Sequence, residues 1–265
     1  MNPAARTREK MPLQERTALT LVSGNGNRRR AAGQGEAGAA QCVTCNLREV
    51  CLPRGLATES EALLDDLVLT RRRVKRGESL YRVGSGFDAL YAVRSGFFKG
   101  RVVLEDGRDQ VTAFHMAGEI MGMDGIGTER HTAEVIALED SEVCVIPYAR
   151  LEEPDLQRQL HKVMSREIVR DQGVMMLLGT MRAGERLAAF LLNLSQRFAA
   201  RGYARDEFHL RMTRDEIGSY LGLSLETVSR LFSRFQEEGL ITVQQKHVRI
   251  LDARALKSLL SRDAD

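Results

Sequence analysis

The sequence predicts an α+β protein in which a β-barrel or sandwich is followed by a long helix and a helical unit with a small β-hairpin. Three patterns support this prediction. Short apolar runs separated by Gly and Asp fill residues 63–147, residues 149–200 are helical in pattern, and two short helical segments followed by two alternating strands lie near the C-terminus. With 265 residues, the chain has room for about two domains.

The composition excludes several classes of protein. Hydrophobic residues make up 43% and charged residues 28% of the chain, which excludes a chain that is disordered throughout. Its apolar runs are only a few residues long, so we expect no membrane-spanning helix. The first residues have no long apolar core or small-residue cleavage site, so we expect a cytoplasmic protein. The net charge of +3 is too small to indicate a nucleic-acid partner by itself.

The N-terminal residues 1–40 are rich in Gly, Ala and Arg and predict a disordered tail. The run Arg28–Arg30 could contact phosphates, although a solvated tail is the simpler interpretation. From residue 63 onward the sequence pattern changes to short apolar runs typical of strands, such as Leu90–Val93, Gly100–Leu104 and Val143–Ile146. Regular turn residues between such strands predict an all-β barrel or sandwich.

An apolar seam begins at His161 and advances in alternating steps of three and four residues. It comprises Met164, Ile168, Asp171, Met175, Leu178 and Arg182. This a/d pattern favours a short dimerisation helix over residues 161–182, and the alternative is an amphipathic helix that packs on its own domain. A charged Asp171 in the middle of the seam is unusual under both interpretations, so we take Ile168, Asp171 and Met175 as a candidate dimer switch.

The C-terminal segment has the spacing of a helix-turn-helix. Thr213 and Glu216 predict a capping box, Gly222 a tight turn, and Ser224 the N-cap of a second helix. The residues that we expect these two helices to bury are Ile217, Leu221, Leu225, Val228, Leu231, Phe232 and Phe235.

The second of these helices carries a polar face that suits DNA. Glu226, Ser229 and Arg230 lie opposite its apolar stripe, and the strands Ile241–Val243 and Val248–Ile250 predict a wing behind it. Arg can bond guanine through two hydrogen bonds, Glu can accept one from cytosine, and Ser adapts to either. The alternative is a solvated helix face. The preceding helix, turn and wing favour double-stranded DNA as the partner.

The four cysteines have an uneven distribution. Cys42, Cys45 and Cys51 form a C-x2-C-x5-C run, and Cys144 lies far away in a predicted strand. Structural zinc usually needs a second C-x2-C pair, and cytoplasmic disulfides are disfavoured. Three clustered cysteines and one distant cysteine are a common iron–sulfur ligand set. From spacing alone, Cys144 is more simply a small buried hydrophobic residue.

Between about Gln41 and Leu259, the sequence resembles the Fnr branch of the Crp–Fnr transcription regulators, which respond to oxygen and control anaerobic metabolism. The matching segments are QCVTCNLREVCLP, LYAVRSGFFKG, FHMAGEIMGMDGIG, ERLAAFLLNLSQRFAARG and LGLSLETVSRLFSRFQ. The resemblance implies a cysteine cluster, a β-roll related to cyclic-nucleotide-binding jelly rolls, a dimerisation helix and a winged helix-turn-helix. The domains expected are a tail over 1–40, a sensor over 41–160, a dimerisation helix over 161–182 and a DNA-binding domain over 183–265.

The resemblance also implies roles for individual residues. Cys42, Cys45, Cys51 and Cys144 match the ligands of one [4Fe–4S] cluster per subunit. The E-x-x-S-R formed by Glu226, Ser229 and Arg230 matches the residues that read palindromes with TTGAT-like half-sites. The resemblance implies a homodimer that binds DNA without oxygen, releases it when oxygen disassembles the cluster, and contacts RNA polymerase.

Two other functions are weighed against this one. A cyclic-nucleotide sensor of the Crp type carries Gly-Glu followed by Arg-Ser/Thr-Ala. This chain has Gly118-Glu119 and Thr132-Ala133, but His131 separates Arg130 from Thr132. Such a sensor also has no use for four placed cysteines. An iron–sulfur enzyme or electron carrier is disfavoured, because the β-region has no catalytic constellation and its histidines are scattered.

Three features depart from the family or bear on its switch. The turn after Glu105, where relatives often carry an acidic residue that contacts RNA polymerase, here reads Gly107-Arg108-Asp109, which puts activation at some promoters in doubt. The segment before Cys42 is longer than the family implies. Asp171 matches an acidic family position implicated in oxygen control, and its ionised copies would repel across a dimer seam.

Overall fold

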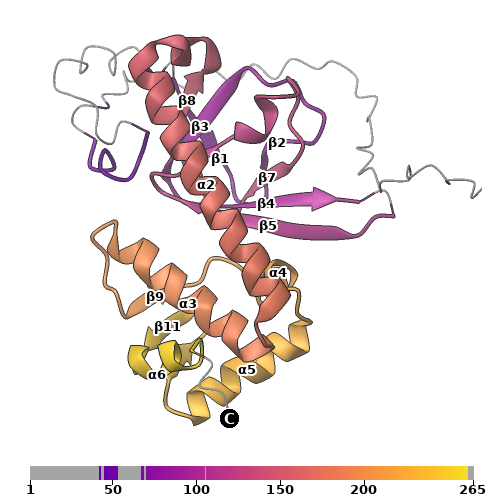
Figure 1. The fold of residues 1–265 in the computed structure, drawn as a ribbon, viewed down its shortest axis with the longest axis vertical. Coiled ribbons are helices and arrows are strands. Elements are labelled where there is room, and N and C mark those ends of the chain that lie inside the picture. Colours follow the sequence, from indigo (N-terminus) through magenta and orange to yellow (C-terminus); the bar gives the residue numbers. More distant parts are fainter. Residues whose placement is uncertain (1–41, 43–44, 53–66, 69, 105, 262–265) are drawn as a thin grey trace, which may run out of the picture.

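The computed structural model describes residues 42, 45–52, 67–68, 70–104 and 106–261. The predicted tail, including Arg28–Arg30, and residue Glu105 lie outside the described residues. In Figure 1 a β-roll lies at one end, the long helix α2 runs down its side, and a smaller helical domain follows at the other end. Among the described helices, none is long and apolar enough to cross a bilayer.

The β-roll consists of two four-stranded antiparallel sheets, which confirms the predicted barrel or sandwich. One sheet has the order β1-β8-β3-β6 and the other β2-β7-β4-β5. The strands are β1 (Thr70–Val74), β2 (Ser79–Tyr81), β3 (Ala89–Ser95), β4 (Phe97–Val103), β5 (Asp109–Met116), β6 (Ile120–Met121), β7 (Glu134–Ala137) and β8 (Ser141–Pro147).

The first sheet is covered on both faces. In β3 the residues from Ala89 to Val93 are all buried, because alternate side chains enter two different cores. Val93 and Tyr91 pack between the two sheets, whereas Leu90 and Ala92 pack on the outer side with the first turns of α2. The outer side of this sheet is therefore a second core.

Helix α2 spans Pro154–Thr180, a length of about 40 Å. It begins before His161, where the seam starts, because Pro154 takes a first-turn position in which its missing N–H costs nothing. The prediction that Arg182 continues the seam is wrong. Met181 is extended and ends α2, and Arg182 is the N-cap of α3 (Ala183–Ala199), where its backbone N–H donates to the carboxylate of Glu185 at 3.1 Å.

The helix-turn-helix prediction is confirmed in its local chemistry. Helix α4 (Arg214–Leu221) opens with the predicted capping box, in which the Glu216 N–H donates to the Thr213 hydroxyl at 3.1 Å. Gly222 adopts φ +64°, which Gly reaches without strain, and turns the chain into α5 (Leu225–Glu237). The hydroxyl of Ser224 caps α5 by accepting the Thr227 N–H at 3.2 Å.

Two details of this domain differ from expectation. Leu225 is 44% exposed rather than buried, because it is the first residue of α5 and lies before the turn that contacts the core. The wing has three strands, since β9 (Glu207–His209) pairs with β11 (His247–Ile250), which also pairs with β10 (Ile241–Gln244). Helix α6 (Ala253–Ser258) follows the wing.

The β-roll packs directly on the helix-turn-helix (Figure 1). The Lys99 ammonium lies 2.7 Å from the Glu216 carboxylate, which joins β4 to the start of α4. The Val111 N–H of β5 donates to the Ser219 hydroxyl at 2.8 Å, and the rings of Phe114 and Tyr220 lie 5.2 Å apart. The two domains thus share one apolar core.

Candidate functional site

The described part of the N-terminal cysteine segment is a series of tight turns. The Cys45 N–H donates to the Cys42 carbonyl at 3.2 Å, and the Cys51 N–H donates to the Leu47 carbonyl at 2.9 Å. Each turn brings its end residues to the same side of the chain. The described cysteines of the C-x2-C-x5-C run therefore lie on successive turns rather than on a helix or strand.

Cys144 comes from the middle of β8, where it pairs with Arg71 of β1 and Ala92 of β3. Successive side chains of a strand point to opposite faces, so Val143 enters the core between the sheets while Cys144 faces outward. Its outward side is the side on which the cysteine segment packs.

All four cysteines line one cavity, which we call the cysteine cavity. Its lining is almost wholly apolar, and it comprises Cys42, Cys45, Leu47, Arg48, Cys51, Leu67, Val68, Ala92, Val93, Arg94, Cys144 and Ile146. The open space of about 30 Å³ has room for about one or two water molecules. The four cysteines form no disulfide. Within the described ranges, no three His, Cys, Asp or Glu side chains are close enough together to hold a single metal ion.

Burial controls the charge of these thiols. Desolvation, with a smaller contribution from the neighbouring thiols, raises the pKa of Cys51 to about 12. Desolvation likewise raises the pKa of Cys144, although Arg94 and Arg71 oppose it. The Arg94 guanidinium lies 3.8 Å from the Cys45 sulfur and 3.2 Å from the Glu142 carboxylate. Such thiols stay protonated unless a cation binds them, so this donor set suits a metal cluster.

The cysteine segment also contacts the start of α2. Leu52, which follows Cys51, is 1% exposed and lies in the same apolar cluster as Leu156, Leu160 and Val163 of α2. Movement of the segment would therefore uncover the first turns of α2.

Farther along α2, the predicted dimer-switch residues lie on an open face. Ile168 is 56% exposed and Met175 is 65% exposed, and Asp171 between them is also exposed. Val169 and Met176 beside them are 64% and 59% exposed. So much exposed apolar surface on one helix is typical of an interaction site.

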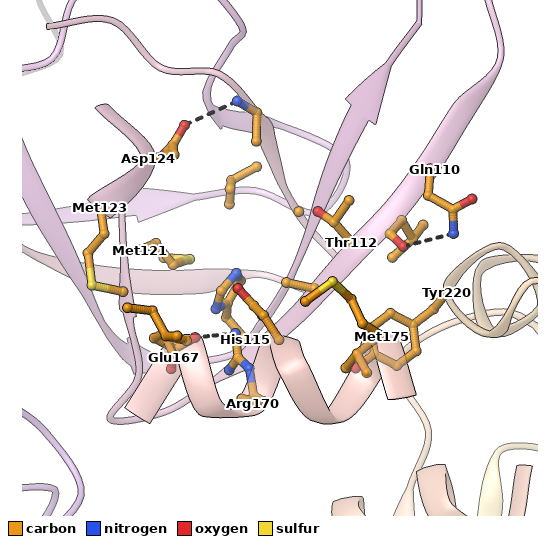
Figure 2. Close-up of a pocket in the computed structure, with 18 of the residues that line it drawn as sticks. Gln110, Thr112, His115, Met121, Met123, Asp124, Glu167, Arg170, Met175 and Tyr220 are labelled. Atoms are coloured by element: carbon orange, nitrogen blue, oxygen red, sulfur yellow. Dashed lines mark hydrogen bonds and ion pairs between the residues drawn. The ribbon is translucent and has the colours of Figure 1, made fainter. Parts of the chain in front are cut away.

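The three switch residues also line a cavity of about 670 Å³ between α2 and the β-roll (Figure 2). His115 on β5 faces this cavity from the sheet, and Glu167 and Arg170 face it from α2. His115 is 8% exposed, and its Nδ1 has no hydrogen-bond partner among the described residues.

The predicted base-reading residues are presented outward. Glu226, Ser229 and Arg230 are all exposed on the first two turns of α5. Among the described residues, the hydrogen bond found for the Arg230 guanidinium is a long one of 3.5 Å to the Thr227 hydroxyl, which leaves it available to a partner. Arg234 is instead tied to Glu238 at 2.8 Å.

The sequence did not predict a buried ion-pair hub at Glu119. The guanidinium groups of Arg197 and Arg201, both near the end of α3, lie 2.7 Å from its two carboxylate oxygens. Burial alone would raise the pKa of Glu119, but Arg197 and Arg201 outweigh it and lower the pKa to about 2. The hub ties α3 to the β5–β6 connection. Its signal in the sequence was only a pair of arginines four residues apart.

Two family models match the chain. The model described as "Crp-like helix-turn-helix domain" matches residues 185–259, and the model described as "Cyclic nucleotide-binding domain" matches residues 71–153. The matched ranges coincide with the C-terminal domain and the β-roll described above.

Three similar proteins span most of the chain. The "Transcriptional regulatory protein btr" of Bordetella pertussis is 49% identical over 85% of this chain and 96% of its own length. The "Transcriptional activator protein Anr" of Pseudomonas protegens is 49% identical, over 80% of this chain and 89% of its own. The "Fumarate and nitrate reduction regulatory protein" of Salmonella typhimurium is 41% identical, over 83% and 90%.

A solved structure has the same fold. FixK2 from Bradyrhizobium japonicum is 28% identical and superposes with a TM-score of 0.68, over 74% of this chain and 98% of its own. Together with the sequence relatives, this similarity identifies a DNA-binding transcription regulator rather than an enzyme.

Proposed function

Because this chain belongs to the Fnr branch of the Crp–Fnr family of transcription regulators, we propose that it is an oxygen-responsive regulator whose cysteines hold one [4Fe–4S] cluster per subunit. Its DNA targets in this proposal are palindromes with TTGAT-like half-sites. It binds them as a homodimer when oxygen is absent.

The observation that carries the proposal is the cysteine cavity. It gathers all four cysteines of the chain, from two segments that are far apart in sequence. If the cysteines were only small buried residues of the core, nothing would require all four of them to line the same apolar cavity. A polynuclear cluster suits ligands that converge on one cavity but not on one point.

When bound, the cluster supplies a group that oxygen oxidises and breaks down. The chain's own part is to couple that event to α2. Cys144 anchors one side of the cavity on a rigid strand, whereas Cys42, Cys45 and Cys51 anchor the turns. With the four anchors held, Leu52 stays packed on α2, and with them lost it is free to leave.

Purification without air tests the cluster. We expect a brown protein with iron and acid-labile sulfide in a ratio near one, and an absorption band that bleaches in air. The same sample should bind a TTGAT palindrome in a gel shift before air exposure and lose that binding afterwards. A colourless anaerobic protein that binds the palindrome equally well in air would contradict the proposal.

Dimerisation is proposed to run through the open face of α2. In a parallel dimer, the two Asp171 carboxylates approach each other across the axis and repel. At a few ångströms this repulsion costs on the order of 1–4 kcal/mol. That cost is enough to keep the protein monomeric in air while a dimer remains reachable when the segment is anchored.

Asp171→Ala tests this step. We expect the variant to sediment as a dimer in air and to bind DNA without a full cluster, whereas Gln172→Ala, one residue off the seam, should behave like the parent protein. An aerobic Asp171→Ala monomer with unchanged DNA affinity would end the idea.

Base reading is proposed for Glu226, Ser229 and Arg230. Arg230→Ala should weaken binding to the TTGAT palindrome by about 1–3 kcal/mol and change binding to unrelated DNA much less. Arg234→Ala is the matched control, because its guanidinium is already paired with Glu238. An equal loss on both DNAs would make Arg230 a phosphate contact. RNA polymerase as a further partner stays a prediction.

A further inference from the structure

The β-roll contains a small anion-binding cradle built from the loop before β7. The backbone N–H groups of Thr132 and Ala133 point to the same spot, and the Thr132 hydroxyl lies beside them. Consecutive N–H groups that converge in this way bind anions such as phosphate or carboxylate. Thr132 and Ala133 are the residues that matched the phosphate cassette of a cyclic-nucleotide sensor in the sequence.

This cradle already holds an anion, the carboxylate of Asp124. One of its oxygens accepts the Thr132 N–H at 2.7 Å and the Ala133 N–H at 3.1 Å, and lies 3.4 Å from the Thr132 hydroxyl. The other oxygen lies 3.3 Å from Nδ1 of His131 and 3.5 Å from the Tyr81 hydroxyl. Both oxygens are therefore engaged, and Figure 2 shows the Asp124 carboxylate bonded toward the neighbouring segment.

The surroundings hold Asp124 in place. It sits on the one-turn helix Met123–Gly125 directly after β6. His131 is only 2% exposed, and its ring stacks on Tyr81 with centroids 3.8 Å apart. Burial alone would raise the pKa of Asp124, but hydrogen bonds from His131, Thr132 and Ala133 outweigh it and hold the pKa below its usual value. The carboxylate is thus charged when it fills the cradle.

The other polar residues of the cassette are engaged as well. The Arg130 guanidinium donates to the Gly84 carbonyl at 2.8 Å. Glu119 is bound on both oxygens by Arg197 and Arg201. The described polar groups of the cassette, from Glu119, Arg130, Thr132 and Ala133, thus have partners within the chain.

We propose that Asp124 is a built-in substitute for a ligand phosphate, which keeps the β-roll in its ligand-filled form without any nucleotide. The proposal goes beyond oxygen control and does not depend on what the cysteines bind. It predicts that the cradle accepts an external oxyanion once the carboxylate is removed.

Asp124→Ala with inorganic phosphate tests this proposal, with the full-length chain and thermal unfolding as the measurement. Loss of a charged acceptor shared by several donors should lower Tm by about 5–10 °C. Phosphate or sulfate at tens of millimolar should recover much of that loss, whereas sodium chloride at equal ionic strength should not. The parent protein should gain nothing from phosphate or from adenosine 3′,5′-cyclic monophosphate.

Asp140→Ala is the matched control. The Asp140 carboxylate also links two loops, but among the described residues it accepts a hydrogen bond only from the exposed Arg76 N–H, at 2.9 Å. Its loss of stability should be the same in phosphate and chloride. If Asp124→Ala does not fold in chloride, its refolding in phosphate becomes the measurement. The second variant is Asp124→Asn, whose amide still fills the cradle, and its stability should not depend on phosphate. Destabilisation of Asp124→Ala without anion rescue, or a phosphate response of the parent protein, would overturn the proposal.

Discussion

The cysteine cavity and the Asp124 cradle lie in the same β-roll, yet they pair their polar groups in opposite ways. The cavity gathers four groups of one kind, and burial keeps Cys51 and Cys144 protonated. The cradle instead brings a carboxylate to N–H donors at 2.7 and 3.1 Å.

This difference separates two kinds of site. Thiols make only weak hydrogen bonds to one another. A cavity that gathers them therefore gains stability when a cation or cluster enters. A carboxylate and N–H groups complete each other, so an external anion has to displace a partner that is already bound. On the two proposals made above, the β-roll has one site that takes an external group and one that supplies its own.

The largest effect is expected when one of the four thiols is removed. Under the proposed assignment, Cys144→Ser should abolish cluster retention, since Cys144 is the only cysteine of the sequence outside the N-terminal segment. Iron content and visible absorbance after anaerobic purification measure the loss. Val145→Ala, on the opposite face of the same strand, should keep its iron. A normal cluster in Cys144→Ser would remove Cys144 from the ligand set.

Glu119, like Asp124, is a carboxylate that already has its partners within the chain, so it tests how much such pairing stabilises the protein. Glu119→Gln removes the charge that neutralises Arg197 and Arg201, and an unpaired buried charge destabilises a protein by about 3–5 kcal/mol. Urea unfolding measures this loss. Glu238→Gln breaks only an exposed pair and should cost about 0–1 kcal/mol. A Glu119→Gln loss no larger than that of the control would show that the hub is not a buried ion pair.

The local chemistry of the helix-turn-helix was predictable because each signal lies within a few residues. Thr213 and Glu216 cap one helix, and Gly222 and Ser224 form the turn. The exposure of Leu225 was not predictable in this way. Helical periodicity gives the apolar side of a helix but not the turn at which the core begins.

The sites of the β-roll were only partly predictable because they depend on long-range pairing. Spacing indicated three cysteines as a group, but Cys144 joins them only through the register of β8 against β1 and β3. Asp124 meets Thr132 and Ala133 through a loop return that no short motif encodes. The sequence suggested an imperfect phosphate cassette, and the carboxylate inside it was missed.

His115 contrasts with Asp124 and Glu119. It is a buried polar residue whose Nδ1 has no partner among the described residues. Burial, with help from Arg170 and Arg197, lowers the pKa of His115 to about 3, although Glu119 and Asp124 oppose the shift. The unfolded chain takes up this proton below pH 6.5 and the folded chain only near pH 3. The free energy of unfolding should therefore fall by up to about 1.4 kcal/mol per pH unit as the pH drops below 6.5.

The window between pH 6.5 and 4.5 isolates this residue from Glu119, whose shift acts only below 4.5. Urea unfolding across this window should show a shallower slope for His115→Phe than for the parent protein. His161→Phe, at an exposed position on α2, should keep the parental slope. An unchanged slope in His115→Phe would mean that Nδ1 has a bound partner, such as an ordered water.

Gly118 lies against the cysteine segment and carries the smallest expected effect. Its φ is +86°, and a Cβ there would lie 2.5 Å from Cγ2 of Val50, which directly precedes Cys51. Gly118→Ala should cost about 1–2 kcal/mol for the left-handed backbone, and it should also push the cysteine segment away from the β-roll. We therefore expect faster loss of iron to a chelator than in the parent protein. Gly77→Ala has a similar φ of +81° but nothing near its Cβ, so it should lose stability without faster iron loss. Equal iron release from both variants would mean that the close contact between residue 118 and Val50 does not hold the cysteine segment in place.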